Sequence, residues 1–189
     1  MLKRIIVLVS LMAVATFAAA KGVYLSAEQF ISSVFPAGKA TVQTLWLKGE
    51  SRSQAETILN RSLGLRTRYW TDGTRTAWIL EEIGKEMPIT IGVVVAGDHI
   101  IDVRIMAYRE SRGGEVRYPF FTNQYSGLSL QKDLSLTDMI DGISGATLSV
   151  RAVTRIARAA LYFHRQVIES ITEVGKDPTL NAQTAKISQ

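Results

Sequence analysis

The sequence has no cysteine among its 189 residues and only two histidines, His99 and His164. Without thiolates the chain cannot be a disulfide-stapled scaffold, hold an iron–sulfur cluster through cysteines, attach a c-type haem or carry a lipoprotein anchor. Two histidines also exclude a histidine-rich metal site, and we expect no metal ligands. If the protein handles electrons, it therefore depends on an organic cofactor.

A strong charge of either sign is also missing. The 22 lysines and arginines face 17 acidic residues, which gives a formal net charge of +5. Lys3 and Arg4 belong to the extreme N-terminus, and without them the excess falls to +3. Nucleic-acid binding usually requires a concentrated basic patch, so this mild and dispersed excess predicts no nucleic-acid partner.

A long apolar run occurs only at the N-terminus. Two basic residues precede the sixteen-residue apolar stretch 5–20, which ends in an A-x-A pattern at Ala18 and Ala20. This order predicts a signal peptide at residues 1–20, cleaved after Ala20, and therefore a periplasmic or otherwise extracytoplasmic bacterial protein. The alternative is a retained N-terminal membrane anchor, although a spanning helix needs about 20 apolar residues.

Cap and stop signals predict three helices in one domain at residues 21–175. Ser26-Ala27-Glu28-Gln29 has the form of a capping box and predicts a helix through Phe35. A second helix is expected to open at Ser51 and to end at Gly64, and a long third helix spans about 149–174. Residues 176–189 are expected to be a flexible tail. The apolar stripe of the long helix comprises Val150, Val153, Ala157, Ala160, Leu161, His164, Val167, Ile168 and Ile171.

The middle of the chain has strand character, with two tight turns at Asp72-Gly73 and Gly97-Asp98. The apolar alternation that begins at Ile101 predicts one buried face for the last strand. These segments predict an α+β fold in which an antiparallel sheet of about four strands packs with helices. The predicted strands of the two hairpins comprise residues 65–71, 74–83, 89–96 and 99–108, and residues 45–47 predict a further short strand.

A stretch of small residues precedes the long helix and places the hydroxyl group of Thr147 at the start of the helix. The first N–H groups of a helix lack partners and carry a partial positive charge. A phosphate bound there gains hydrogen bonds and about 0.3–1 kcal/mol from the helix dipole. Gly145 and Ala146 allow a bulky phosphate to approach the backbone, and Arg151 could add a donor by turning back.

The pattern Asp141-x-x-Ser144-Gly145-Ala146-Thr147 resembles the D-x-x-[ST]-G-A-T flavinylation motif of FMN-binding domains. Such domains occur in one of the subunits of sodium-pumping NADH:quinone reductases, in one of those of Rnf electron-transport complexes and in smaller exported flavoproteins. In this family an FAD-dependent flavin transferase places FMN on the motif threonine as a phosphodiester and releases AMP. The resemblance therefore implies covalent FMN on Thr147.

The resemblance continues upstream and covers about residues 89–161. The loop from Glu110 to Gly114 resembles the glutamate–glycine loop that meets the flavin in the family, and Phe121-x-x-Gln124-Tyr125-x-Gly127 resembles a stretch of the smaller members. The respiratory subunits have threonine–proline–glycine after the glutamate, whereas Ser111-Arg112-Gly113 follows here, which favours a small stand-alone member. The flavin-binding residues that the resemblance implies are Asp141, Ser144, Gly145, Ala146, Thr147, Leu148, Ser149, Glu110, Ser111, Gly113 and Gly114.

Several of these residues have a structural alternative. A plain turn with solvated charges is the alternative to flavin contact at Glu110 and the glycines that follow. Phe120, Phe121 and Tyr125 are interpreted as core rather than as a cofactor wall, and His164 as a core histidine.

The resemblance implies an exported covalent flavoprotein that transfers electrons between a membrane-associated donor and an extracytoplasmic acceptor. We expect an electron-transfer protein or oxidoreductase subunit rather than an independent enzyme, without catalytic residues of its own. Its implied partners are the flavin transferase and membrane-bound or periplasmic redox proteins. The alternatives are an extracytoplasmic flavin reductase acting on a small organic acceptor and a non-redox binding domain that retains the fold.

Overall fold

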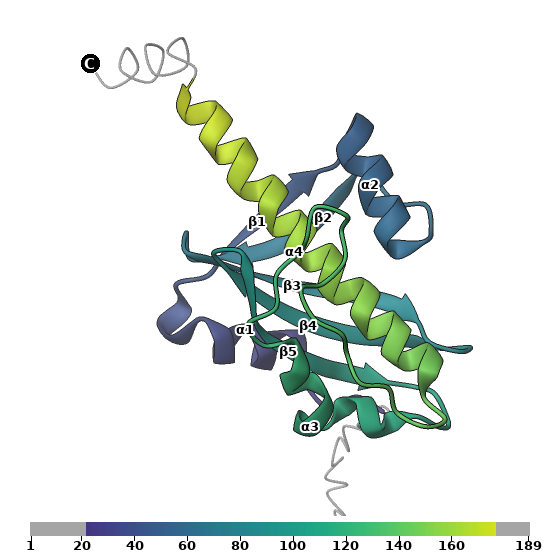
Figure 1. Cartoon of the computed structure of the whole chain (residues 1–189). Helices are drawn as coiled ribbons and strands as arrows, with labels where there is room; N and C mark the ends of the chain where they lie inside the picture. The colour runs from purple at the N-terminus through teal and green to yellow at the C-terminus, as the bar shows by residue number, and fades with distance from the viewer. Residues whose placement is uncertain (1–21, 177–189) are drawn as a thin grey trace, which may run out of the picture.

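A computed structural model describes residues 22–176 and shows the predicted α+β fold, with an antiparallel sheet between helices (Figure 1). The sheet has five strands in chain order, β1-β2-β3-β4-β5, rather than about four. The additional strand is β1 (Thr41–Trp46), which extends the short stretch predicted at 45–47 and pairs along the whole of β2 (Arg66–Thr71).

Both predicted hairpins are confirmed. β2 turns into β3 (Arg75–Ile83), and in this turn the Asp72 carboxylate accepts the backbone N–H groups of Thr74 and Arg75 at 3.0 and 3.1 Å. β4 (Pro88–Ala96) turns into β5 (His99–Tyr108).

The alternation predicted for β5 is wrong at both ends of the strand. Near its end, Met106 and Tyr108 lie on the face predicted to be exposed but are buried. At its start the order is also different. Ile101 is 50% exposed, whereas Ile100 is buried. A register shift at Val94/Val95 changes which β5 side chains face the core, and a second shift follows at Thr90/Ile91. Sequence alternation assumes an unbroken pleat, so it cannot anticipate such bulges.

One face of the sheet is covered by α1 (Ala27–Val34), which begins at the predicted capping box of Ser26 and Gln29. Phe30 is fully buried and packs in a cluster with Val94 and Met106. A Cβ atom at Gly92 would lie 2.6 Å from the Phe30 ring, so glycine on β4 allows this helix to approach the sheet.

The long helix α4 (Thr147–Lys176) crosses the other face of the sheet beside α2 (Gly49–Leu59), as Figure 1 shows. Its predicted stripe is buried from Val150 to Val167. Ile168 and Ile171 are 46% and 63% exposed, contrary to the prediction. The last turns of the helix extend beyond the sheet, where no strand remains to cover them (Figure 1).

The bounds of α2 differ from those predicted. The helix begins at Gly49, because Ser51 accepts the Lys48 N–H as the third residue of the helix rather than as its cap. It ends at Leu59, and its C-cap is Asn60, whose φ of 51° is the left-handed conformation expected of Gly64.

The connection from β5 to α4, predicted as a loop as far as residue 130, contains three short helical turns: η2 (Gly114–Arg117), α3 (Pro119–Thr122) and η3 (Asn123–Tyr125). A further short turn, η1 (Pro36–Gly38), follows α1. The signal predicted at residues 1–20 and the tail predicted at 176–189 lie outside the described residues, apart from Lys176. Within residues 22–176 no helix is long and apolar enough to cross a membrane.

Candidate functional site

A tight turn places Thr147 at the first position of α4. The Ala146 N–H donates to the Ile143 carbonyl at 2.9 Å, which closes a four-residue turn. Gly145, its third residue, has a φ of +80°, which a type II turn requires there and which glycine adopts without steric cost. The Ala146 carbonyl then accepts the Val150 N–H at 2.9 Å and starts the helix, leaving Thr147 exposed.

Alanine at the cap position leaves the start of α4 open. Serine, threonine, aspartate or asparagine would bond to the first helical N–H groups, and alanine has no atom to do so. Among the described residues, no hydrogen bond is formed by the backbone N–H groups of Thr147, Leu148 or Ser149. The first turn also contains no acidic side chain. Three donors and the positive end of the helix dipole are therefore available to an anion.

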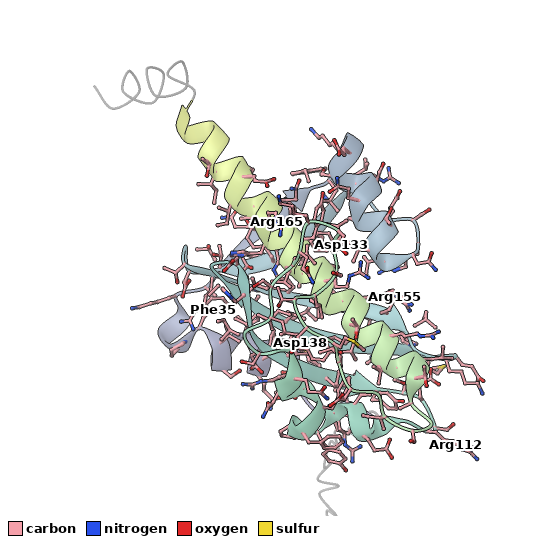
Figure 2. The ribbon with its side chains drawn as sticks, in the orientation of Figure 1. Phe35, Arg112, Asp133, Asp138, Arg155 and Arg165 are labelled. Carbon is pink, nitrogen blue, oxygen red and sulfur yellow. The ribbon has the colours of Figure 1, made fainter. Side chains whose placement is uncertain are left out.

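A cleft of about 610 Å³ lies at this end of α4, the end at which Figure 2 shows Arg112. Seven of the predicted flavin-binding residues line it together: Glu110, Ser111, Gly145, Ala146, Thr147, Leu148 and Ser149. Arg112 and Lys85 complete the lining and add two positive charges. Lys85 belongs to the β3–β4 turn, and no motif in the sequence marks it.

The loop after β5 is tied to α4 by Tyr108. Its hydroxyl donates to the Arg112 carbonyl and lies 2.9 Å from the Ser149 Oγ. Since the phenol has one proton, the Ser149 hydroxyl donates to the Tyr108 oxygen. Burial raises the pKa of Tyr108, so this phenol stays neutral at physiological pH. The Ser149 hydroxyl is therefore engaged in holding the loop, although the residue borders the cleft.

Glu110 organises the β3–β4 turn. One carboxylate oxygen, Oε1, accepts the backbone N–H groups of Lys85, Glu86 and Met87 at 2.6, 2.7 and 2.9 Å. Burial favours the neutral acid, but these three donors and the charge of Lys85 outweigh it and lower the pKa of Glu110. The carboxylate therefore positions Lys85 at the cleft.

Four of the predicted residues do not line the cleft: Asp141, Ser144, Gly113 and Gly114. Asp141 and Ser144 are exposed, and the Asp141 backbone N–H donates to the Gln124 side-chain oxygen at 2.7 Å, which fixes the motif loop against η3. Gly113 packs behind the cleft, where an added Cβ atom would lie 3.0 Å from that of Ala146.

Three of the four residues interpreted as core are buried. Phe121 and Tyr125 are fully buried, and the Tyr125 hydroxyl lies 2.9 Å from the Thr154 Oγ1. His164 is 3% exposed, and its Nδ1 lies 2.8 Å from the Thr76 Oγ1. Phe120, in contrast, is 63% exposed and belongs to the surface. Arg151 lines a different groove from the Thr147 cleft. No group of acidic, histidine or cysteine side chains suited to a metal ion occurs within residues 22–176.

All the residues that line this cleft lie within the part of the chain that matches a known family. The model of the family described as FMN-binding domain matches residues 84–162. One component of the Na(+)-translocating NADH-quinone reductase from Parabacteroides distasonis is a structural neighbour, with 18% sequence identity and a TM-score of 0.46. The match covers 67% of this chain and 76% of that one. No curated protein matches the sequence.

Proposed function

We propose that this chain carries FMN as a phosphodiester on the Thr147 hydroxyl and serves in electron transfer. The match of the FMN-binding domain model to residues 84–162 supports this proposal. One observation carries the proposal: Thr147 is exposed as the first residue of α4 and borders a cleft lined by Lys85 and Arg112. The cleft volume of about 610 Å³ falls within the roughly 300–1,000 Å³ typical of cofactor sites.

The residues present fit a flavin phosphate. A phosphodiester carries one negative charge, and the start of α4 offers unpaired N–H donors and a partial positive charge. Lys85 and Arg112 add two cations to the lining. Glu110, the acidic residue of this lining, accepts hydrogen bonds from three backbone N–H groups through Oε1, which stabilise its negative charge, and the two cations still leave the lining with a net positive charge.

The attachment is a phosphoryl transfer with no change of oxidation state. The Thr147 Oγ1 forms a bond to the flavin-side phosphorus of FAD, and the bond between that phosphorus and the oxygen of the AMP phosphate breaks. AMP leaves with this oxygen, and the hydroxyl proton passes to a base of the flavin transferase. Asp141 and Ser144 are exposed beside Thr147, where a modifying enzyme can reach them.

Attachment suits a protein that works outside the cytoplasm. Bound FMN supplies one- and two-electron redox chemistry, and the chain supplies its attachment and surroundings. A covalent bond at Thr147 prevents loss of the cofactor where it cannot readily be replaced. We place the protein in the periplasm or an equivalent compartment, between a membrane-associated electron donor and an extracytoplasmic acceptor.

The test is the intact mass of the protein exported from a host that contains an FAD-dependent flavin transferase. We expect the wild-type chain to gain the mass of one FMN less one water and to remain yellow after denaturation. The Thr147→Ala variant should fold with an unchanged circular dichroism spectrum and gain no such mass, because the accepting hydroxyl is gone. The same mass measurement reports whether residues 1–20 have been removed.

Thr44→Ala is the matched control, since Thr44 is an exposed threonine on β1 and should be replaceable without loss of the flavin. Covalent flavin retained by the Thr147→Ala protein, or an unmodified wild-type peptide from the same host, would contradict the proposal.

A further inference from the structure

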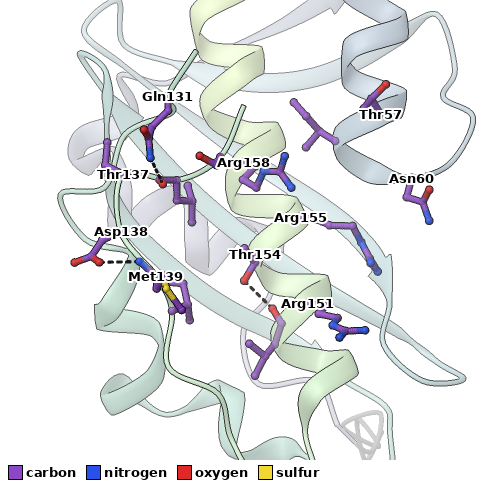
Figure 3. A pocket seen from close by; sticks show the side chains of 15 residues that line it. Thr57, Asn60, Gln131, Thr137, Asp138, Met139, Arg151, Thr154, Arg155 and Arg158 are labelled. Atoms are coloured by element: carbon purple, nitrogen blue, oxygen red, sulfur yellow. Dashed lines mark hydrogen bonds between the residues drawn. The ribbon is translucent and has the colours of Figure 1, made fainter. Parts of the chain in front are cut away.

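A second and larger groove runs along the outer face of α4 (Figure 3). Its volume is about 920 Å³, and its floor is formed by α4 side chains between Val150 and Arg158. Thr57 of α2 and its C-cap Asn60 provide one wall, and residues 131–140 provide the other. None of the residues that line the Thr147 cleft lines this groove.

Three arginines lie along the floor. Arg151, Arg155 and Arg158 are four and three residues apart, a spacing that places them on one face of a helix. Asp138 is the one acidic residue among the described residues that line the groove. The lining therefore has an excess of positive charge.

The charge of Arg155 is only partly neutralised by a carboxylate beneath the groove. Arg155 Nη2 lies 2.9 Å from Oε1 of Glu82, a residue that is 6% exposed. The other oxygen of the same carboxylate lies 3.1 Å from Arg61 Nε. One negative charge is thus shared between two guanidinium groups, and a net positive charge remains.

Arg155 also has a donor without an acceptor. Its Nε atom is buried and has no hydrogen-bond partner among the described residues. A buried donor without a partner is unfavourable, so an acceptor that reached this atom would stabilise the site. Arg158 is held in place, since its Nε donates to the Leu134 carbonyl at 2.5 Å.

The walls of the groove are partly apolar. Met139 is 89% exposed, and its neighbour Ile140 faces the same groove. The remaining apolar side chains of the lining are Ile58, Leu136 and Val150. A ligand with a charged end and an apolar body matches this mixture better than an inorganic ion does.

We propose that this groove is a binding site for a small organic anion, with one or more carboxylates on the arginines and an apolar body against Met139 and Ile140. The two walls favour a small molecule over a partner protein, because a convex surface would contact the walls before it reached the floor. The site begins one helical turn from Thr147, about 6 Å along the axis of α4. It does not require the flavin.

The experiment is calorimetric titration of the purified, flavin-free Thr147→Ala protein with phthalate, an aromatic dicarboxylate. We expect saturable binding that weakens at least about tenfold in an added Arg151→Gln variant, because loss of one charge-assisted hydrogen bond costs about 1.5–3 kcal/mol. Arg151 is exposed, so its replacement should not impair folding. Arg158→Gln, made in the same flavin-free protein, should also weaken the binding of phthalate.

Arg165→Gln is the matched control. Like Arg158, Arg165 lies on α4 and donates to a backbone carbonyl, that of Leu130 at 2.9 Å, but it lies outside the groove. Phthalate affinity should not change in this variant, whereas an equal loss in all three arginine variants would overturn the proposal.

Two further probes test the class of ligand. Inorganic phosphate bound as tightly as phthalate would overturn the role of the apolar walls. A short glutamate peptide bound more tightly than phthalate would overturn the small-molecule assignment in favour of an acidic partner protein. Absence of saturable phthalate binding would overturn the site itself, and because flavin-free protein is used, none of these outcomes bears on the flavin proposal.

Discussion

Gly113 connects the loop after β5 to the start of α4. Its φ is +82°, and an added Cβ atom would lie 2.8 Å from the Tyr108 hydroxyl oxygen and 3.0 Å from the Cβ atom of Ala146. The Tyr108 hydroxyl is fixed by two hydrogen bonds and Ala146 is buried, so neither neighbour can move without disturbing the cleft. This glycine is therefore required for packing as well as for its backbone conformation.

We expect Gly113→Ala to lower the free energy of unfolding by about 2–5 kcal/mol. Left-handed backbone costs alanine roughly 1–2 kcal/mol, and overpacking adds about 1–3 kcal/mol. The measurement is urea unfolding followed by circular dichroism. Gly127→Ala is the control, because Gly127 has a φ of +80° but nothing within 4 Å of an added Cβ atom. Equal losses in the two variants would rule out the packing role of Gly113.

At this scale the sequence predicts the position of Thr147 but not all of its neighbours. The motif around Thr147 is local, so spacing alone indicates its place at the start of a helix. Lys85 lies in a turn more than fifty residues away along the chain, and only the fold brings it to the cleft. Ser149 lies two residues after the motif, yet its contact with Tyr108 cannot be predicted from sequence order.

At the scale of elements, the β3–β4 turn depends on a carboxylate from another loop. Glu110 accepts three successive backbone N–H groups of this turn and thereby joins it to the end of β5. The folded protein holds the pKa of Glu110 below its ordinary value. Between these two pKa values the folded state therefore binds fewer protons than the unfolded state. The stabilisation is present above the ordinary pKa and is lost as pH falls through the lowered one.

We expect the stability of the wild-type protein to fall as pH drops below about 4.3, the ordinary glutamate value, and Glu110→Gln to reduce this dependence. At neutral pH the variant should lose about 1–3 kcal/mol, because charge-assisted bonds to backbone donors are weakened. Urea unfolding over a pH series measures both effects.

Glu115→Gln removes the same charge from the same stretch of chain without touching the three bonds to Glu110. Its free energy of unfolding at neutral pH should stay within about 0.5 kcal/mol of the wild type, as is usual for surface substitutions. A Glu110→Gln protein as stable as this control would show that the turn does not depend on the carboxylate.

The type of each major element could be predicted from local pattern, whereas several boundaries and faces could not. The capping box at Ser26 and the turn at Asp72 each depend on a few consecutive residues, and both are confirmed. The exposure of Ile101 depends on a bulge in the pairing of β4 with β5. The exposure of Ile171 depends on where the sheet ends beneath α4. The sequence of the helix carries no information about that position.

At the scale of the whole molecule, His164 joins α4 to the sheet. Its Nδ1 lies 2.8 Å from the hydroxyl oxygen of Thr76 on β3, and the Trp78 indole donates to the same oxygen at 2.8 Å. Burial lowers the pKa of His164 and so favours the neutral ring. The unfolded chain takes up a proton at higher pH than the folded one, which makes stability decrease as pH falls below the ordinary histidine value.

We therefore expect the free energy of unfolding to decline as pH falls from about 6.5, the ordinary histidine value, toward the lowered pKa of His164. His164→Asn should be less stable at pH 7 but should lack this decline, because the amide does not titrate. Chemical unfolding at a series of pH values provides the measurement, with the ring resonances followed by NMR and His99→Asn used to assign them. A His164 ring that titrates at or above 6.5 would contradict the expectation.

The missing cap on α4 has a consequence for how the protein matures. A helix whose first turn has no side-chain acceptor frays more readily than a capped one, typically by about 0.5–2 kcal/mol. A phosphate esterified to Thr147 would provide the acceptor that Ala146 cannot. If flavin is attached at Thr147 as proposed, the same step would therefore also stabilise the first turn of α4, and the modified protein should resist fraying at this end better than the unmodified one.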